Sequence, residues 1–185
     1  MSNQTMTMIE KRRSHRCYSD KQIDPHQLET LMQAALHSPS ARDLQPWHFS
    51  FVQNKELLSQ INRAAHQQAR MLSDANRSTR FLDGDFHIFY HAPTVVVISS
   101  AAGNFSSIDC GIAVQTLALA AESLGLGSVI VGLADLAFRG DDRINLENAL
   151  QFPKGYQFMI SIAIGTATDD KPAHSLNLDK ISLIE

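Results

Sequence analysis

The hydrophobic positions of the chain recur at spacings of three and four residues in several stretches, which predicts helices with a buried face. The first stretch has the marks of a helix start, because Asp24 can cap it, Pro25 suits its first position and Gln27 completes a capping box. The most apolar stretch is hydrophobic almost all round, so we expect it to run through the core and to stop at Gly125. The predicted helices cover residues 25–37, 55–72, 109–124 and 144–150.

Alternating and continuous apolar runs predict strands between these helices. Trp47, Phe49 and Phe51 fall on one face, as in a half-buried strand. Residues 94–99 form a continuous, mostly β-branched run that is typical of a strand buried on both faces. The predicted strands cover residues 47–52, 94–99, 128–133, 158–164 and 180–184. Because single strands alternate with helical segments, this order favours a sheet covered by helices over a β-sandwich.

Length and composition describe an ordinary globular chain. The 185 residues fit one domain over residues 1–185, and 44% apolar with 19% charged residues lies far from the composition of disordered chains. The formal net charge of -3 argues against a nucleic-acid-binding protein, which would carry a surplus of lysine and arginine. Cys17 and Cys110 are too few for a disulfide framework, and no apolar stretch has the length of a signal peptide or a membrane span. We therefore expect a cytoplasmic protein.

One short segment carries a local excess of positive charge, and we call it the anchor segment: Arg12, Arg13, Ser14, His15 and Arg16. The planar fork of arginine matches the oxygens of a phosphate and keeps its charge at any relevant pH, and a serine hydroxyl can donate one more hydrogen bond. The segment is therefore a candidate phosphate site. On composition alone, a solvated charged turn is the more common outcome for such a run.

A second segment, residues 38–47, links the first predicted helix to the first predicted strand and contains two prolines, small residues and Trp47. Small residues in a turn-rich loop let a flat ligand approach the backbone. The alternative is a plain connecting loop in which Trp47 anchors the chain to the core. Spacing alone does not separate these interpretations.

Other motifs give weaker signals. Gly125-Leu126-Gly127 begins like a dinucleotide-binding fingerprint, but it follows a helix where that motif requires a strand. His87 and His91 have the spacing of metal ligands on a helix, yet no third ligand is evident, so we expect no metal site. No nucleophile elbow or phosphate-loop motif occurs. Residues 73–91 lack clear periodicity and are expected to form an excursion longer than an ordinary connection.

The anchor segment and the 38–47 loop, in this order along the chain, resemble the FMN-dependent nitroreductase family. That family opens with an Arg-Arg-Ser-x-Arg-like segment after a short helix and continues with a Pro-Ser-x-x-Asn-x-Gln-Pro-Trp-like loop. Further similarity lies in residues 92–97, in Asp109 with Gln115, and in residues 120–128. The similarity spans nearly the whole chain.

The resemblance implies a three-layer α+β fold, in which a central, mostly antiparallel sheet is covered by helices. It also implies an intertwined homodimer that forms through long helices and holds FMN at the subunit interface, so that each site draws on both chains. The implied FMN contacts are Arg12, Arg13, Ser14 and Arg16 of one subunit, Pro39, Ser40 and Ala41 of the other, Gln45, and the backbone around Ile130, Val131 and Gly132, which would face the isoalloxazine ring.

Two positions depart from the family pattern. The family often has Asn where this chain has Asp43, and a carboxylate close to the ring would disfavour the extra electron density of a reduced flavin. Near the C-terminus, where related proteins often place a basic phosphate contact, this chain offers His174 and Lys180. These two residues complete the set of candidate cofactor contacts.

The function that the resemblance implies is oxidation of NADH or NADPH by ping-pong hydride transfer through FMN, with nitroaromatic, quinone or flavin-like acceptors. The flavin carries the redox chemistry, so no side chain is expected to act as a nucleophile or strong base and we name no catalytic residue. One alternative is an FMN-storing or sensor protein without nicotinamide-dependent reductase activity. Another is a flavin-dependent dehalogenase or flavin-destroying relative on the same fold, although such members generally carry added lid segments.

Overall fold

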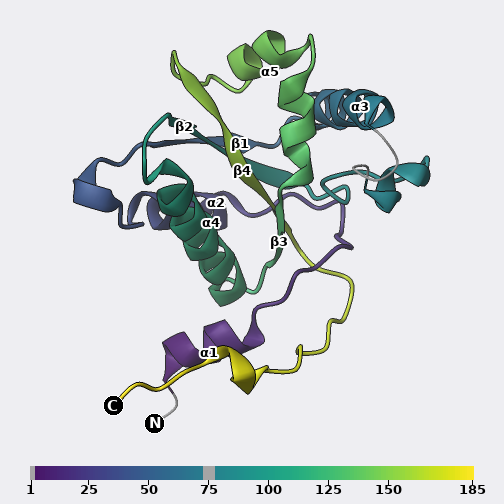
Figure 1. Ribbon diagram of the computed structural model, residues 1–185. Coiled ribbons are helices and arrows are strands. Elements are labelled where there is room, and N and C mark those ends of the chain that lie inside the picture. Colours follow the sequence, from purple (N-terminus) through teal and green to yellow (C-terminus); the bar gives the residue numbers. More distant parts are fainter. Residues whose placement is uncertain (1–2, 73–77) are drawn as a thin grey trace.

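The computed structural model describes residues 3–72 and 78–185 and has three layers, a sheet between two sets of helices (Figure 1). The strands are β1 (Trp47–Val52), β2 (Thr94–Ala101), β3 (Gly127–Val131) and β4 (Tyr156–Gly165). The α-helices are α1 (Gln4–Lys11), α2 (Pro25–Leu36), α3 (Lys55–Met71), α4 (Ser106–Ser123) and α5 (Arg143–Ala149). Short 3-10 helices cover Ala41–Asp43, Thr79–Leu82, Leu133–Arg139 and Leu178–Lys180. The predicted sheet covered by helices is confirmed.

Neighbouring strands of the sheet are all antiparallel, in the order β1-β2-β4-β3. β2 lies inside the sheet and is buried over all but its last residue, so the predicted central strand is confirmed. Its Val95 and Val97 pack into the core beneath α3 and α5. Val96 and Ile98 pack into the opposite core, beneath α2 and α4. This alternation of side chains joins the sheet to both helical layers.

Local signals at two helix ends behave as predicted. Asp24 accepts a hydrogen bond from the backbone N–H of His26, and the Gln27 side chain accepts one from the backbone of Asp24, so the capping box of α2 is confirmed. The Gln27 amide also donates to the Leu124 carbonyl (3.1 Å), which ties the start of α2 to the end of α4. Gly125, with a φ of 72°, follows α4 as the predicted stop.

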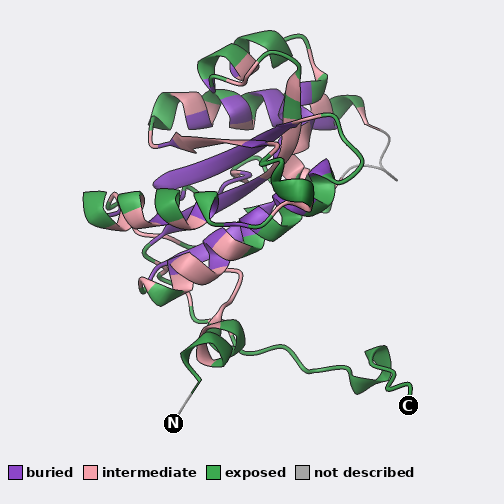
Figure 2. Cartoon of the chain, turned by 90° about the vertical axis from the view of Figure 1, so that its left-hand side faces the viewer, coloured by how far each residue is buried: buried purple, intermediate pink, exposed green. Residues whose placement is uncertain are grey.

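The strand predicted over residues 180–184 is wrong. Residues 170–185, which we call the C-terminal tail, leave the folded body as an exposed segment with a short 3-10 helix at Leu178–Lys180 (Figure 2). An apolar segment becomes a strand only beside another strand, and within the described residues the tail has no such neighbour. Its aliphatic side chains therefore stay exposed, up to 87% for Ile184.

Several other boundaries shift by a few residues. The strand predicted over 128–133 ends at Val131, because Leu133–Arg139 turns into a 3-10 helix. α1 was not indicated by any periodic signal of its own, and α4 begins before Asp109. Residues 73–77 of the predicted excursion lie outside the described residues, and the rest of it consists of turns and a 3-10 helix.

α4 is only half buried in the single chain. Leu117 and Ala121 are buried against the sheet, whereas Ile108 and Ile112 are 57% and 38% exposed. The expectation that this helix runs through the core is therefore right for one face and wrong for the other. The described part of the chain contains no helix with the length and apolar character needed to cross a membrane.

Candidate functional site

The anchor segment leaves α1 and runs beside the edge strand β3. His15 donates its backbone N–H to the carbonyl of Ser128 (3.0 Å), and Ser14 forms a parallel bridge with the same serine. Farther along, Tyr18 pairs with Ala167 just after β4. Backbone contacts to the sheet therefore hold the anchor segment in place.

Gly127 makes room for this close approach. A Cβ atom at Gly127 would lie 2.6 Å from the Cβ of Ala167 and 3.1 Å from the His15 ring, which is too close for any other residue without a shift. The predicted helix stop at Gly125 thus holds, whereas the sequence did not indicate the packing role of Gly127. Gly127 begins a strand and lies against the anchor segment.

The positive side chains of the anchor segment are only partly satisfied by the protein. Arg13 donates to the carbonyls of Glu10 (2.6 Å) and Arg12 (2.8 Å). Arg16 donates to the Ser14 carbonyl (3.4 Å). The Nε atoms of Arg13 and Arg16 are buried without a hydrogen-bond partner, and within the described residues the guanidinium of Arg12 and the hydroxyl of Ser14 have none either. Buried, unpartnered donors on cationic groups fit an anionic ligand such as phosphate.

A further guanidinium group, from a distant segment, lies against the same aromatic ring as Arg16. Arg80 donates to the Tyr90 hydroxyl, and the guanidinium groups of Arg80 and Arg16 lie 6.0 and 5.8 Å from the centre of the Tyr90 ring. Tyr90 and His91 both adopt left-handed backbone conformations, with φ values of 54° and 55°. Sequence reasoning missed Arg80, because residues 73–91 carry no periodicity that would place it; the aromatic residues around it are the only hint.

The 38–47 loop is held in an unusual backbone conformation. Arg42, Asp43 and Gln45 have φ values of 57°, 54° and 45°, in a region that residues other than glycine seldom adopt. The Ser40 hydroxyl accepts from the Gln45 backbone N–H (2.9 Å), and the Gln45 amide donates to the Asp43 carboxylate (3.0 Å). Such conformations persist only where surrounding contacts impose them, and they cluster at ligand sites.

The body of the protein fixes this loop at two points. Asp109, in the first turn of α4 and only 3% exposed, accepts a hydrogen bond from the backbone N–H of Ala41 (3.0 Å). Ser100 on β2 donates its hydroxyl to the Pro46 carbonyl (2.9 Å). Trp47, which follows, is buried in the core, as its interpretation as a core anchor predicts. The position of the loop therefore depends on α4.

The structure does not bring the loop to the anchor segment of the same chain. Within the described residues no hydrogen bond, ion pair or ring contact joins them, and they lie apart in Figure 1. The predicted contacts therefore fall into two groups, one with Arg12, Arg13, Ser14 and Arg16 and the other with Pro39, Ser40, Ala41 and Gln45.

The predicted contacts on β3 join the first of these groups. Ile130 is 39% exposed near the end of β3, whereas Val131 is buried and its carbonyl accepts from the Ser161 hydroxyl (2.7 Å). Gly132 follows directly and is the N-cap of the 3-10 helix Leu133–Arg139. Because Ser14 of the anchor segment pairs with Ser128 of β3, the anchor segment lies beside the strand that carries Ile130 and Val131.

His174 and Lys180 lie in the exposed C-terminal tail. Within the described residues neither forms a hydrogen bond or an ion pair with the anchor segment. The tail begins beside the anchor segment and then runs away from the folded body (Figure 2). The structure therefore places neither residue at the phosphate site of its own chain.

His87 and His91 lie side by side, with ring centres 4.5 Å apart. Nδ1 of His87 accepts from the Phe89 backbone N–H (3.2 Å), which places the proton of the neutral ring on Nε2 and leaves neither nitrogen free for a metal. Burial, with His91 and His66 as further causes, lowers the pKa of His87 to about 4, so the ring is neutral at neutral pH. The described residues contain no group of three or more His, Cys, Asp or Glu side chains that could hold a metal ion.

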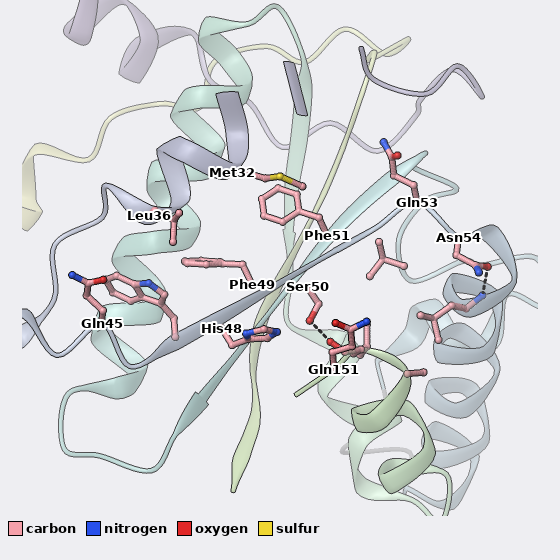
Figure 3. A pocket seen from close by; sticks show the side chains of 15 residues that line it. Met32, Leu36, Gln45, His48, Phe49, Ser50, Phe51, Gln53, Asn54 and Gln151 are labelled. Carbon is pink, nitrogen blue, oxygen red and sulfur yellow. Dashed lines mark hydrogen bonds between the residues drawn. The ribbon is translucent and has the colours of Figure 1, made fainter. Parts of the chain in front are cut away.

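An apolar groove of about 690 Å³ runs along the outer edge of β1 (Figure 3). Phe49 and Phe51 of β1 point toward Met32 and Leu36 of α2, and residues 149–151 close the other side. β1 is an edge strand, so its outer backbone groups have no strand partner within the sheet. The groove and the unpaired edge of β1 therefore leave room for one additional strand.

Known proteins share the fold and the sequence pattern of this chain. A model of the nitroreductase family matches residues 9–166. An FMN reductase (NAD(P)H) from Bacillus subtilis is 32% identical over 177 residues, which cover 90% of this chain and 67% of that protein. A nitroreductase with bound FMN from Desulfitobacterium hafniense is 32% identical, with a TM-score of 0.93 over 100% of both chains. An FMN-dependent nitroreductase from Clostridium difficile is 27% identical, with a TM-score of 0.85 over 100% of both chains.

Replacing Asp109 with Ala should loosen the 38–47 loop, because the Ala41 N–H then loses its acceptor at a buried position. We expect the free energy of unfolding to fall by about 1–3 kcal/mol and amide exchange at Ala41 to accelerate. The control Asp43→Asn removes an exposed negative charge from the same loop but keeps an oxygen for the Gln45 amide and a residue type that tolerates a positive φ, so it should change the free energy by less than about 0.5 kcal/mol. Unchanged amide exchange at Ala41 in Asp109→Ala would contradict this role.

Proposed function

The chain belongs to the nitroreductase family, and we propose that it is an FMN-dependent NAD(P)H oxidoreductase built on one domain over residues 1–185. The observation that carries the proposal is the set of buried, unpartnered guanidinium donors of the anchor segment beside β3. A flavin phosphate supplies the acceptors that these donors lack. The Desulfitobacterium hafniense relative, which contains bound FMN, supports the same assignment.

The residues on this side of the sheet have distinct binding roles in the proposal. Arg12, Ser14 and Arg16 would hold the phosphate and the ribityl chain, with Arg13 beside them. Ile130 and the backbone after it would lie against the ring, since its side chain is exposed on the strand that the anchor segment pairs with.

Bound FMN supplies the redox chemistry, which is hydride uptake from NADH or NADPH followed by reduction of a nitroaromatic, quinone or flavin-like acceptor in a ping-pong sequence. The protein binds and orients the flavin and excludes water from it.

Tyr18 helps to hold the anchor segment in place. Burial, followed by the nearby charge of Asp169, raises the pKa of Tyr18 far above its ordinary value, so the phenol stays protonated and donates to the His15 carbonyl (2.8 Å).

Asp43 stands where the family often has Asn. Its carboxylate is exposed and accepts a neutral amide hydrogen bond from Gln45, and within the described residues no cationic side chain forms an ion pair with it. A negative charge near the ring disfavours the electron-rich reduced flavin. We propose that Asp43 lowers the reduction potential of bound FMN and so restricts the acceptors that it can reduce.

We infer that two copies of the chain form each flavin site. The anchor segment and the 38–47 loop lie apart in one chain, and both are needed for the predicted set of contacts. α4 presents an exposed apolar face that includes Phe105, Ile108 and Ile112. Its buried Asp109 also holds the loop. Packing α4 against a second copy would cover this face and carry the partner's loop toward the anchor segment.

The C-terminal tail gives this dimer its intertwined form in the proposal. The tail has five exposed aliphatic residues, Leu176, Leu178, Ile181, Leu183 and Ile184, and pairs with no strand within the described residues. The groove along β1 offers an unpaired strand edge and an apolar lining. We infer that the tail of one subunit occupies the groove of the other, which would give residues 180–184 the strand partner that they lack.

Anaerobic stopped-flow tests the proposed activity. Purified holoprotein mixed with NADH or NADPH should lose its oxidised-flavin absorbance, because hydride transfer reduces bound FMN. A second mixing with a quinone or a nitroaromatic should restore the absorbance. Tight FMN binding without bleaching by either nicotinamide would contradict the reductase and favour a storage or sensor protein.

Removing residues 176–185 tests the proposed dimer. The shortened protein should sediment as a monomer and bind FMN at least about tenfold more weakly, since binding and association are linked. Removal of Glu185 alone is the matched control and should change neither property. A shortened protein that remains dimeric would rule out the tail as the occupant of the groove.

A further inference from the structure

Asp169 is a mostly buried carboxylate at the point where the C-terminal tail begins. Its side chain is 12% exposed, and both of its oxygens are used. Oδ1 lies 2.8 Å from Nδ1 of His15, and Oδ2 accepts the backbone N–H of Arg16 (3.0 Å). Nζ of Lys171 lies 3.7 Å from the same Oδ2. The carboxylate thus contacts two consecutive residues of the anchor segment, which are more than 150 positions away in the sequence.

Backbone contacts around Asp169 bring the two segments together. The backbone N–H of Thr168 donates to the Cys17 carbonyl (3.0 Å), and that of Ser19 donates to the Thr166 carbonyl (3.0 Å). The chain after β4 therefore runs beside the chain that follows the anchor segment. Asp169 lies at the end of this contact and extends it to Arg16.

These contacts determine which way the anchor segment faces. In an extended segment neighbouring side chains point to opposite sides, so when His15 points toward Asp169, Ser14 and Arg16 point away from it. The buried Nε of Arg16 has no hydrogen-bond partner within the described residues. A hydrogen bond to the Arg16 backbone fixes the base of the side chain and leaves its guanidinium group available to a ligand.

The charge of Asp169 is compensated where it lies. Burial alone would raise the pKa of Asp169, but hydrogen bonds from the Arg16 backbone and the His15 ring lower it, so the carboxylate is ionised at neutral pH. His15 and Lys171 are the groups that face it with positive or potentially positive charge. An uncompensated carboxylate so close to a phosphate site would weaken phosphate binding.

We propose that Asp169 is a positioning residue for the anchor segment, which it holds by the Arg16 backbone and the His15 ring so that Ser14 and Arg16 face the cofactor phosphate. This inference rests on the proposed function, because it takes the ligand to be FMN. Both oxygens of Asp169 are occupied by the anchor segment, so the proposal gives Asp169 no direct contact with the ligand. It acts through the conformation of the anchor segment.

Three variants separate position from charge. Asp169→Ala removes both acceptors, and we expect the dissociation constant of FMN to rise at least about tenfold. Asp169→Asn keeps an oxygen that can accept the Arg16 N–H, so affinity should return to within about threefold of the wild type. Asp170→Ala, at the exposed neighbouring position, makes the same change in net charge and should leave affinity unchanged. FMN binding is followed by quenching of flavin fluorescence in the apoprotein.

Two further measurements distinguish failure of the positioning role from failure of the proposed function. Hydrogen exchange at the Arg16 amide should accelerate in the Asp169→Ala apoprotein and not in Asp170→Ala, whether or not FMN binds. Gly127→Ala, which crowds His15 and Ala167, should weaken FMN binding by an independent route. Equal FMN affinity in Asp169→Ala and Asp170→Ala, or tighter binding in Asp169→Ala and Asp169→Asn, would overturn the positioning role. If the wild-type protein binds no FMN, while the Arg16 amide still exchanges faster in Asp169→Ala than in Asp170→Ala, the proposed function is overturned and the positioning role stands.

Discussion

Positive charge that is fixed in place but incompletely paired is the constraint on which the rest of this site depends. Leaving a buried guanidinium N–H without an acceptor costs free energy. The chain nevertheless holds Arg13 and Arg16 in that condition beside β3. Packing at Gly127, the bridge at Ser128 and the carboxylate of Asp169 all hold the anchor segment against the sheet. In the proposed function a phosphate ligand resolves the conflict, because it supplies acceptors and opposite charge together.

The same constraint explains why half of the proposed site lies elsewhere. In the proposal, a phosphate held by the anchor segment leaves the flavin ring to be covered by other residues. The 38–47 loop is suited to this, because it contains small residues, has a strained backbone and is held to α4 through Asp109. α4 is also the helix whose outer apolar face is uncovered in one chain. In the proposed dimer, covering that face with a second copy also completes the ligand site. Cofactor binding should stabilise the dimer, and the dimer should strengthen cofactor binding.

The fold could be predicted from the sequence where its signals are local. The capping box at Asp24 and the stop at Gly125 depend on a few adjacent residues, and both are confirmed. The continuous run of β2 reports burial on both faces, which the sheet order confirms. The strand at 180–184 failed because a strand needs a neighbour, and none lies within the described residues of one chain. The apolar pattern of α4 predicted a helix, but it did not show which faces of the helix would be covered by the same chain.

The candidate site was predictable only in part, for a similar reason. Arg12, Ser14 and the residues on β3 were found because they lie in short recognisable segments, and the structure brings these segments together. Arg80 and Asp169 were missed, since neither lies in a motif of its own. Asp169 contacts the anchor segment from a distant part of the sequence, and Arg80 is linked to it through the Tyr90 ring. Long-range contacts of this kind follow from the packing of the sheet rather than from any local pattern.

Titration of the apoprotein with FMN and with riboflavin tests the central claim most directly, because the two ligands differ only in the phosphate. A phosphate site at the anchor segment predicts that FMN binds at least about a hundredfold more tightly, since charge-assisted hydrogen bonds contribute about 1.5–3 kcal/mol each. The difference should shrink as ionic strength rises. Equal affinities for FMN and riboflavin would contradict the assignment of residues 12–16 as the phosphate anchor.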